Sequence, residues 1–85
     1  MMAERVLLFG RLKDVFGASW LAMPGGVQTA AELRERLAAA YPDLADIIRS
    51  RAVRIAVNQE MAMDEEATTL KVGDEVALLP PLSGG

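Results

Sequence analysis

The chemistry of this chain is predicted to lie in its last six residues, Pro80-Pro81-Leu82-Ser83-Gly84-Gly85. The two prolines fix φ and favour an extended path away from the preceding segment. Gly84 and Gly85 carry no side chain, so the terminal carboxylate of Gly85 can enter a channel too narrow for a Cβ. Because a free carboxylate is a poor electrophile, a partner enzyme must first convert it to a mixed anhydride. The pattern therefore predicts a terminus that reacts inside a partner enzyme, and the alternative is a frayed terminus without a role.

The rest of the sequence offers little catalytic chemistry. It contains neither Cys nor His, which excludes a thiol nucleophile, a zinc–thiolate site and the commonest general acid or base. The runs Asp64-Glu65-Glu66 and Asp74-Glu75 are typical of a solvated acidic surface and lack the spacing of a calcium loop. Gly25-Gly26 lacks the Lys-Ser/Thr that follows a phosphate-binding loop. We therefore expect no permanently bound cofactor, no metal site, and catalytic groups supplied by a partner.

Composition limits the remaining possibilities. The chain has 85 residues, of which 52% are hydrophobic, so it can form one small domain, predicted over residues 1–79 with the tail at 80–85. Its 9 Lys and Arg against 12 Asp and Glu give a net charge of −3, which argues against nucleic acid and an anionic membrane as partners. The apolar run at 6–9 is too short for a signal peptide or a membrane span, so a cytoplasmic protein is expected.

The hydrophobic pattern predicts strands around one main helix. Thr29 and Glu32 have the spacing of a capping box at the start of a helix over 30–41, which Pro42 ends. Within this helix, Glu32 and Arg36 can pair at i, i+4. The other predicted elements are a strand over 5–12, a helical turn at 13–17 ended by Gly17, a hairpin strand over 19–23, a short helix capped by Asp43, a strand over 53–58, a weak edge strand within 61–70 and a last strand over 75–79.

This order indicates an α+β domain with one main helix packed across one face of a mixed sheet. The crossover rule places the strand after the helix parallel to its partner in the sheet. Two sets of alternating apolar residues face opposite sides, one with Leu7, Phe9, Ala77 and Leu79 and the other with Val6, Leu8, Val76 and Leu78. The set that does not meet the helix should form an apolar patch for a partner, unless the loop at 59–72 covers it.

Residues 72–85, with the sequence VGDEVALLPPLSGG, closely resemble the C-terminal signature of the MoaD family. Members of this family are ubiquitin-like sulfur carriers and small subunits of molybdopterin synthase. Residues 6–17 and 57–59 resemble the opening strand and a strand–turn of the same family. The resemblance implies a β-grasp fold, and the double proline at 80–81 favours the molybdopterin branch.

The resemblance also implies a carrier cycle with three partners. An E1-like (MoeB-like) adenylating enzyme would transfer AMP to the Gly85 carboxylate, and a sulfur donor would replace AMP to leave a thiocarboxylate. The tail would then insert into a MoaE-like large subunit, which holds the catalytic groups, and give its sulfur to cyclic pyranopterin monophosphate. By motif position, Phe9 and Leu79 match residues that pack against the large subunit, although the family often has aromatics at 78–79 where this chain has Leu78-Leu79.

Three alternatives remain open at this point. The chain could carry sulfur for thiamine, cysteine or tRNA thiolation. It could instead modify proteins, with Gly85 joined to lysine side chains. It could also be an interaction module with an inert tail.

Overall fold

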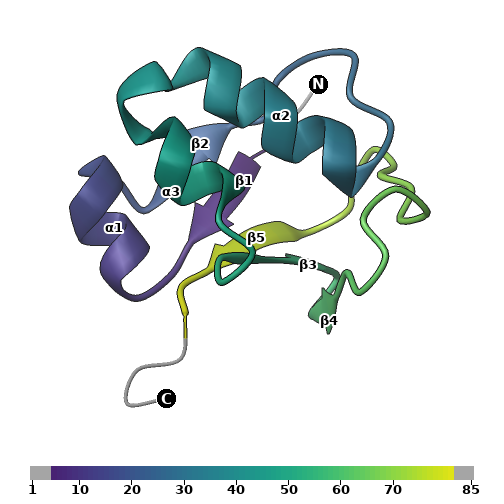
Figure 1. Ribbon diagram of the computed structural model, residues 1–85. Coiled ribbons are helices and arrows are strands. Elements are labelled where there is room, and N and C mark those ends of the chain that lie inside the picture. Colours follow the sequence, from purple (N-terminus) through teal and green to yellow (C-terminus); the bar gives the residue numbers. More distant parts are fainter. Residues whose placement is uncertain (1–4, 82–85) are drawn as a thin grey trace.

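The computed structural model describes residues 5–81. They form a five-stranded sheet with helices packed across one face (Figure 1). The elements in chain order are β1 (Arg5–Leu8), α1 (Arg11–Phe16), β2 (Trp20–Ala22), α2 (Ala30–Ala40), a 3₁₀ helix (Pro42–Leu44), α3 (Ala45–Arg49), β3 (Arg54–Val57), β4 (Glu60–Met61) and β5 (Val76–Leu79). The predicted α+β architecture with a main helix across a mixed sheet is confirmed. Within the described range, no helix has the length and apolar character needed to cross a membrane.

The strand order in the sheet is β2-β1-β5-β3-β4, so the last strand of the chain lies at its centre. β5 pairs in parallel with β1 and antiparallel with β3, and the hairpins β1–β2 and β3–β4 are antiparallel. The prediction that the strand after the main helix is parallel to its sheet partner is therefore wrong. β3 does run in the same direction as β2, but β1 and β5 lie between them, so the parallel ladder forms between β1 and β5 instead.

The main helix begins as the sequence predicts. Its N-cap Thr29 accepts a hydrogen bond from the Glu32 amide at 3.2 Å. The Glu32 carboxylate accepts from the amide of Gln28 at 2.7 Å, one residue before the cap. The predicted Glu32–Arg36 ion pair does not form in the described chain, because Arg36 instead donates to the carbonyl of Gly25 at 2.7 Å.

Two local boundaries differ from the predictions. The first strand ends at Leu8 rather than at Leu12, because Gly10 adopts φ 56° and ψ −135° and turns the chain into α1. Leu12 is therefore buried as a residue of α1 and not as a residue of a strand. Gly17 ends α1 at φ 70°, as expected. Asp43 caps no helix, since it lies inside the 3₁₀ turn and α3 begins after it without a side-chain cap.

The core lies between the sheet and the helices. The set Val6, Leu8, Val76 and Leu78 faces the helices and is buried, which settles which face of the sheet they cover. The largest fully buried side chains are Leu33, Leu37, Ile48, Ile55, Leu78, Val6 and Val76.

One arginine joins the helical layer to the loops. The guanidinium of Arg34 in α2 donates to both carboxylate oxygens of Glu65. It also donates to the carbonyls of Ile48 at 2.7 Å, Ser50 at 3.0 Å and Val53 at 2.8 Å. With its side chain only 11% exposed, Arg34 ties α2 to the end of α3, to the start of β3 and to the loop after β4.

We expect Arg34→Ala to lower the free energy of unfolding by about 2–4 kcal/mol, because it leaves a half-buried carboxylate and carbonyls without their donor. The matched control is Arg49→Ala, which breaks the exposed Arg49–Glu35 pair at 3.1 Å. An exposed pair contributes little, so this change should cost less than about 1 kcal/mol. Urea unfolding measures both values, and equal losses would contradict the role given to Arg34.

Candidate functional site

The tail leaves the domain from the central strand of the sheet. β5 ends at Leu79, and the described chain continues through Pro80 and Pro81. Proline lacks the N–H that a further ladder bond would need, so the strand stops where the prolines begin. The other predicted tail residues, Leu82, Ser83, Gly84 and Gly85, lie outside the described residues, and their role stays a prediction.

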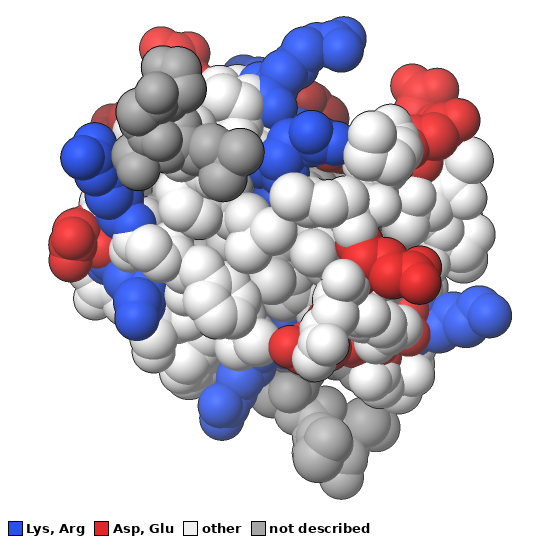
Figure 2. Space-filling view, turned by 90° about the horizontal axis from the view of Figure 1, so that it is seen from below, with Lys and Arg blue, Asp and Glu red and all other residues white. Residues whose placement is uncertain are grey.

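The face of the sheet opposite the helices is largely apolar, and we call it the open face. Its apolar members are Leu7, Phe9, Trp20, Ala56, Met61, Ala77 and Leu79. The register also places Arg5 and Arg54 on this face, with Arg54 opposite Leu79. Figure 2 looks onto this side from below and shows uncharged surface across its centre, with charged side chains around it. Monomeric proteins rarely leave such a patch without a function, so the open face is a candidate docking surface.

A shallow hollow of about 390 Å³ lies in the open face. Phe9 and Leu79, the two predicted partner residues, both line it, together with Ala56, Met61 and Ala77. The small side chains form the floor, since Ala56 and Ala77 are only 7% and 6% exposed although no helix covers them. Phe9 stands at the side and is 43% exposed, so it is available to a partner.

The alternative that the loop at 59–72 covers this face is not realised. Part of the loop instead pairs with the start of α2, on the helical side of the sheet. The Leu70 amide donates to the Gln28 carbonyl at 2.9 Å, and the Ala30 amide donates to the Thr68 carbonyl at 2.9 Å. Thr69 forms a β-bridge with Thr29.

Sequence reasoning missed three members of the open face. Pairing places Trp20 opposite Leu7, Ala56 opposite Ala77 and Met61 opposite Ala56. The guanidinium carbon of Arg5 lies 4.3 Å from the centre of the Trp20 ring, a cation–π contact at the edge of this face. The alternation within each strand was visible in the sequence, but the register between strands that brings these residues together was not.

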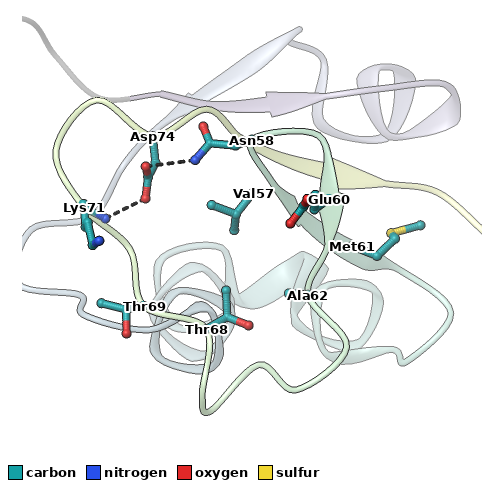
Figure 3. A pocket seen from close by; sticks show the side chains of 9 residues that line it. All are labelled: Val57, Asn58, Glu60, Met61, Ala62, Thr68, Thr69, Lys71 and Asp74. Atoms are coloured by element: carbon teal, nitrogen blue, oxygen red, sulfur yellow. Dashed lines mark hydrogen bonds between the residues drawn. The ribbon is translucent and has the colours of Figure 1, made fainter.

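A second, polar hollow of about 280 Å³ lies between β3 and the turn before β5 (Figure 3). Asn58 donates to Asp74 at 3.0 Å and accepts from the Glu75 amide at 3.0 Å, while the Lys71 amide donates to Asp74 at 2.7 Å. These bonds fasten the β3–β4 turn, where Asn58 has φ 53°, to the start of β5. Within the range that the structure describes, no group of acidic side chains is arranged to hold a metal. The bonds of Asn58 and Asp74 thus join the two turns that border the polar hollow.

The hydrogen bond from Asn58, followed by that from the Lys71 amide, holds the pKa of Asp74 below its usual value. Both donors favour the ionised carboxylate more than its protonated form.

Comparison with known proteins reveals relatives over the whole chain. The model of the ThiS family matches residues 6–85. The molybdopterin synthase sulfur carrier subunit of Chlamydomonas reinhardtii is 35% identical over 86 residues, covering 99% of this chain and 100% of the relative. The human protein of the same name is 31% identical over 83 residues, covering 94% of this chain and 91% of its own length.

Solved structures agree with the fold. The crystal structure of SAMP1 from Haloferax volcanii matches with a TM-score of 0.72 and 27% identity, covering 99% of this chain and 100% of that one. The solution structure of small archaeal modifier protein 1 from Methanosarcina acetivorans matches with a TM-score of 0.74 and 25% identity over the whole of both chains. The predicted β-grasp fold is confirmed.

The bonds around Asp74 give a test of the polar hollow. We expect Asn58→Ala to move the pKa of Asp74 back up toward its ordinary value, because the first cause of its lowering is removed. A carboxylate with a lowered pKa stabilises the fold above its unfolded pKa, and this contribution is lost as pH falls through the folded pKa. Asn58→Ala should therefore show a smaller loss of stability on acidification.

An NMR titration of the Asp74 carboxyl carbon measures the change directly. Thr69→Ala is the control, since Thr69 lines the same hollow without bonding Asp74. An unchanged Asp74 titration in Asn58→Ala would assign the shift to another cause.

Proposed function

The chain belongs to the ThiS family, and on that basis we propose that it is the sulfur carrier subunit of a molybdopterin synthase. The proposal assigns the terminal carboxylate of Gly85 as the group that carries sulfur in molybdenum cofactor biosynthesis. Relatives named molybdopterin synthase sulfur carrier subunit, at 30–35% identity over nearly the whole chain, support it.

The observation that carries the proposal is the course of β5. This strand is held on both sides in the sheet, contributes Ala77 and Leu79 to the open face, and passes directly into Pro80-Pro81 and the Gly-Gly end. A partner that docks on the hollow beside Phe9 and Leu79 therefore also holds the base of the tail. Docking and delivery of the terminus are in this way one event.

The proposed cycle begins with activation of the terminus. A carboxylate oxygen of Gly85 attacks the α-phosphorus of ATP on an E1-like enzyme, pyrophosphate leaves, and an acyl adenylate forms. Hydrosulfide released by a sulfur donor then attacks the acyl carbon, the bond from that carbon to the phosphate oxygen breaks so that AMP leaves, and loss of the S–H proton to solvent gives the thiocarboxylate. Neither step needs an acid or base from the carrier, in agreement with a chain that has no His and no Cys.

The cycle ends in a large subunit. There the thiocarboxylate sulfur attacks a carbon of cyclic pyranopterin monophosphate that carries a phosphate-ester oxygen, and that C–O bond breaks as the C–S bond forms, which opens the cyclic phosphate. Water then cleaves the resulting thioester to return the Gly85 carboxylate and leave a thiol on the pterin. The carrier contributes its docking face and its tail, and the large subunit contributes the catalytic groups. The adenylate and the thiocarboxylate are transient covalent intermediates at Gly85, so the proposed cycle requires no permanently bound cofactor.

A second function is supported by the structural neighbours. The SAMP1 proteins are named as archaeal modifiers, and they match this chain over nearly all of its length. In a modifier, a lysine amine in place of a sulfur nucleophile would attack the activated Gly85 carbonyl and form an isopeptide bond. The two functions share activation and differ in the attacking nucleophile, so the product on Gly85 separates them.

Deleting Gly85, or adding one Ala after it, should abolish thiocarboxylate formation, because the reacting carbonyl is then displaced or no longer terminal. The control Ser83→Ala keeps the Gly-Gly end and should retain it. Thermal unfolding should be unchanged in all three variants, since none alters residues of the sheet. The measurement is mass spectrometry of the terminal peptide after co-expression with an E1-like enzyme and a sulfur donor, where one oxygen is exchanged for sulfur.

Thiocarboxylate on the deletion variant would overturn the tail assignment. Branched lysine peptides without thiocarboxylate would favour the modifier. A thiocarboxylate that a large subunit cannot use, but that supports another thiolation pathway, would move the chain to a different carrier branch.

We expect Phe9→Asp and Leu79→Asp each to weaken binding to the large subunit by about a hundredfold or more, because an unpaired charge buried at an interface costs several kcal/mol. Ile47→Asp is the matched control: Ile47 is 37% exposed, comparable to Phe9 at 43%, but belongs to the helical layer. Calorimetric titration measures affinity, and circular dichroism confirms the fold. Normal binding by both sheet variants would remove the open face from the interface.

A further inference from the structure

Gly10 and Pro80 lie against each other at the base of the tail. The parallel ladder pairs Val6 with Val76 and Leu8 with Leu78, and the next residues along both chains bring Gly10 beside Pro80. A Cβ placed on Gly10 would lie only 2.8 Å from Cγ of Pro80 and 3.7 Å from Cδ. The first distance is shorter than real Cβ contacts, so any side chain at Gly10 requires Pro80 or the turn to move.

We propose that Gly10 is a positioning residue for the carrier tail. Because it has no side chain, the half-buried Pro80 ring can lie against the turn between β1 and α1, and this contact fixes the direction in which the chain leaves β5. The inference rests on the proposed function, since only a tail that must reach an active site needs a defined direction.

Because residue 80 is a proline, a contact with its side chain also acts on the backbone. Its ring locks φ, so a displacement of the Pro80 ring moves the backbone with it instead of being absorbed by rotation of a side chain. Pro81 follows at once with the same restriction, so the direction set at Pro80 is kept to the end of the described chain. A misplacement of about 1 Å at a reacting group can cost a hundredfold in rate. We therefore expect a steric change at the base of the tail to alter how Gly85 is presented to a partner enzyme.

A competing explanation is that Gly10 serves only its backbone conformation. Gly17, at the other end of the same short helix, is the control for a positive φ without this contact; its φ 70° and ψ 25° lie in the left-handed helical region, whereas Gly10 has φ 56° and ψ −135°, where a side chain is more strained. A Cβ on Gly17 meets nothing within 4 Å. Ala strains the backbone more at Gly10 than at Gly17, and only Ala at Gly10 also collides with Pro80. The two explanations are therefore separated by the split between kcat and KM and by rescue with Pro80→Ala, which relieves the collision but not the backbone strain.

The experiment compares Gly10→Ala and Gly17→Ala as substrates of an E1-like enzyme, with ATP–pyrophosphate exchange as the readout. We expect kcat for Gly10→Ala to fall about tenfold below that of Gly17→Ala, with KM for the carrier unchanged, because the open face still docks while the terminus is misplaced. Simple destabilisation would give the opposite split. It lowers the concentration of folded carrier, which raises the apparent KM and leaves kcat at saturation intact.

Rescue by a second substitution tests the contact itself. Pro80→Ala removes Cγ and Cδ, the two nearest atoms, so Gly10→Ala combined with Pro80→Ala should lose clearly less than the product of the two single losses. Gly17→Ala combined with Pro80→Ala should show no such coupling. In the unmodified chain, an NOE between the Gly10 Hα and Pro80 Hγ protons should be present without any partner.

The results distinguish a wrong carrier function from a wrong role for Gly10. If the unmodified chain supports no exchange, the carrier function is wrong, and the tail role of Gly10 falls with it. If that chain is active but Gly10→Ala behaves like Gly17→Ala, or Pro80→Ala gives no rescue, the role of Gly10 alone is overturned. Absence of the NOE would overturn the packing on which the role depends.

Discussion

The pairing of β5 on both of its sides constrains the rest of the molecule. Hydrogen bonds to β1 and β3 hold this strand at the centre of the sheet, and Val76 and Leu78 are buried beneath the helices. A chain end is ordinarily the part of a fold that frays first. Here the last strand belongs instead to the best-supported part of the sheet, and the prolines after Leu79 end its ladder abruptly. The tail therefore begins from a fixed point.

The two faces of the sheet have different tasks. The helical face is filled by branched aliphatic side chains and fastened by Arg34, so it supplies stability. The open face keeps small residues at its centre, with Ala56 and Ala77 paired across β3 and β5, and larger ones around them. Burying such a face in a partner would remove apolar area from water, and the free energy of this transfer is favourable by about 25 cal/mol per Å². Stability and recognition can thus be changed independently, because they draw on opposite sides of the same strands.

The sequence was sufficient for the features that depend on local pattern. The alternation in 5–9 and 75–79 predicted two apolar faces, the Thr29 cap predicted the start of the main helix, and the VGDEVALLPPLSGG segment carried the family resemblance. It did not predict the insertion of β5 between β1 and β3, because strand order depends on pairing across the whole chain. Nor did it predict the hydrogen bonds that Arg34 donates to three backbone carbonyls. An arginine on a helix resembles a surface charge until folding brings the carbonyls of 48, 50 and 53 around it.

If the reactive group is the backbone terminus, as proposed, few functional side chains are needed, and the requirements on the sequence fall elsewhere. No acid, base or nucleophile has to be positioned, so the constraints fall on residues that define shape. Prolines limit the path of the tail, Ala56 and Ala77 leave the hollow open, and Gly10 leaves room for Pro80. A substitution at such a position adds atoms and removes no chemical group. Under the proposed function, the residues that matter most for delivery of the terminus are therefore among the smallest in the chain, and they do not stand out in a search for catalytic side chains.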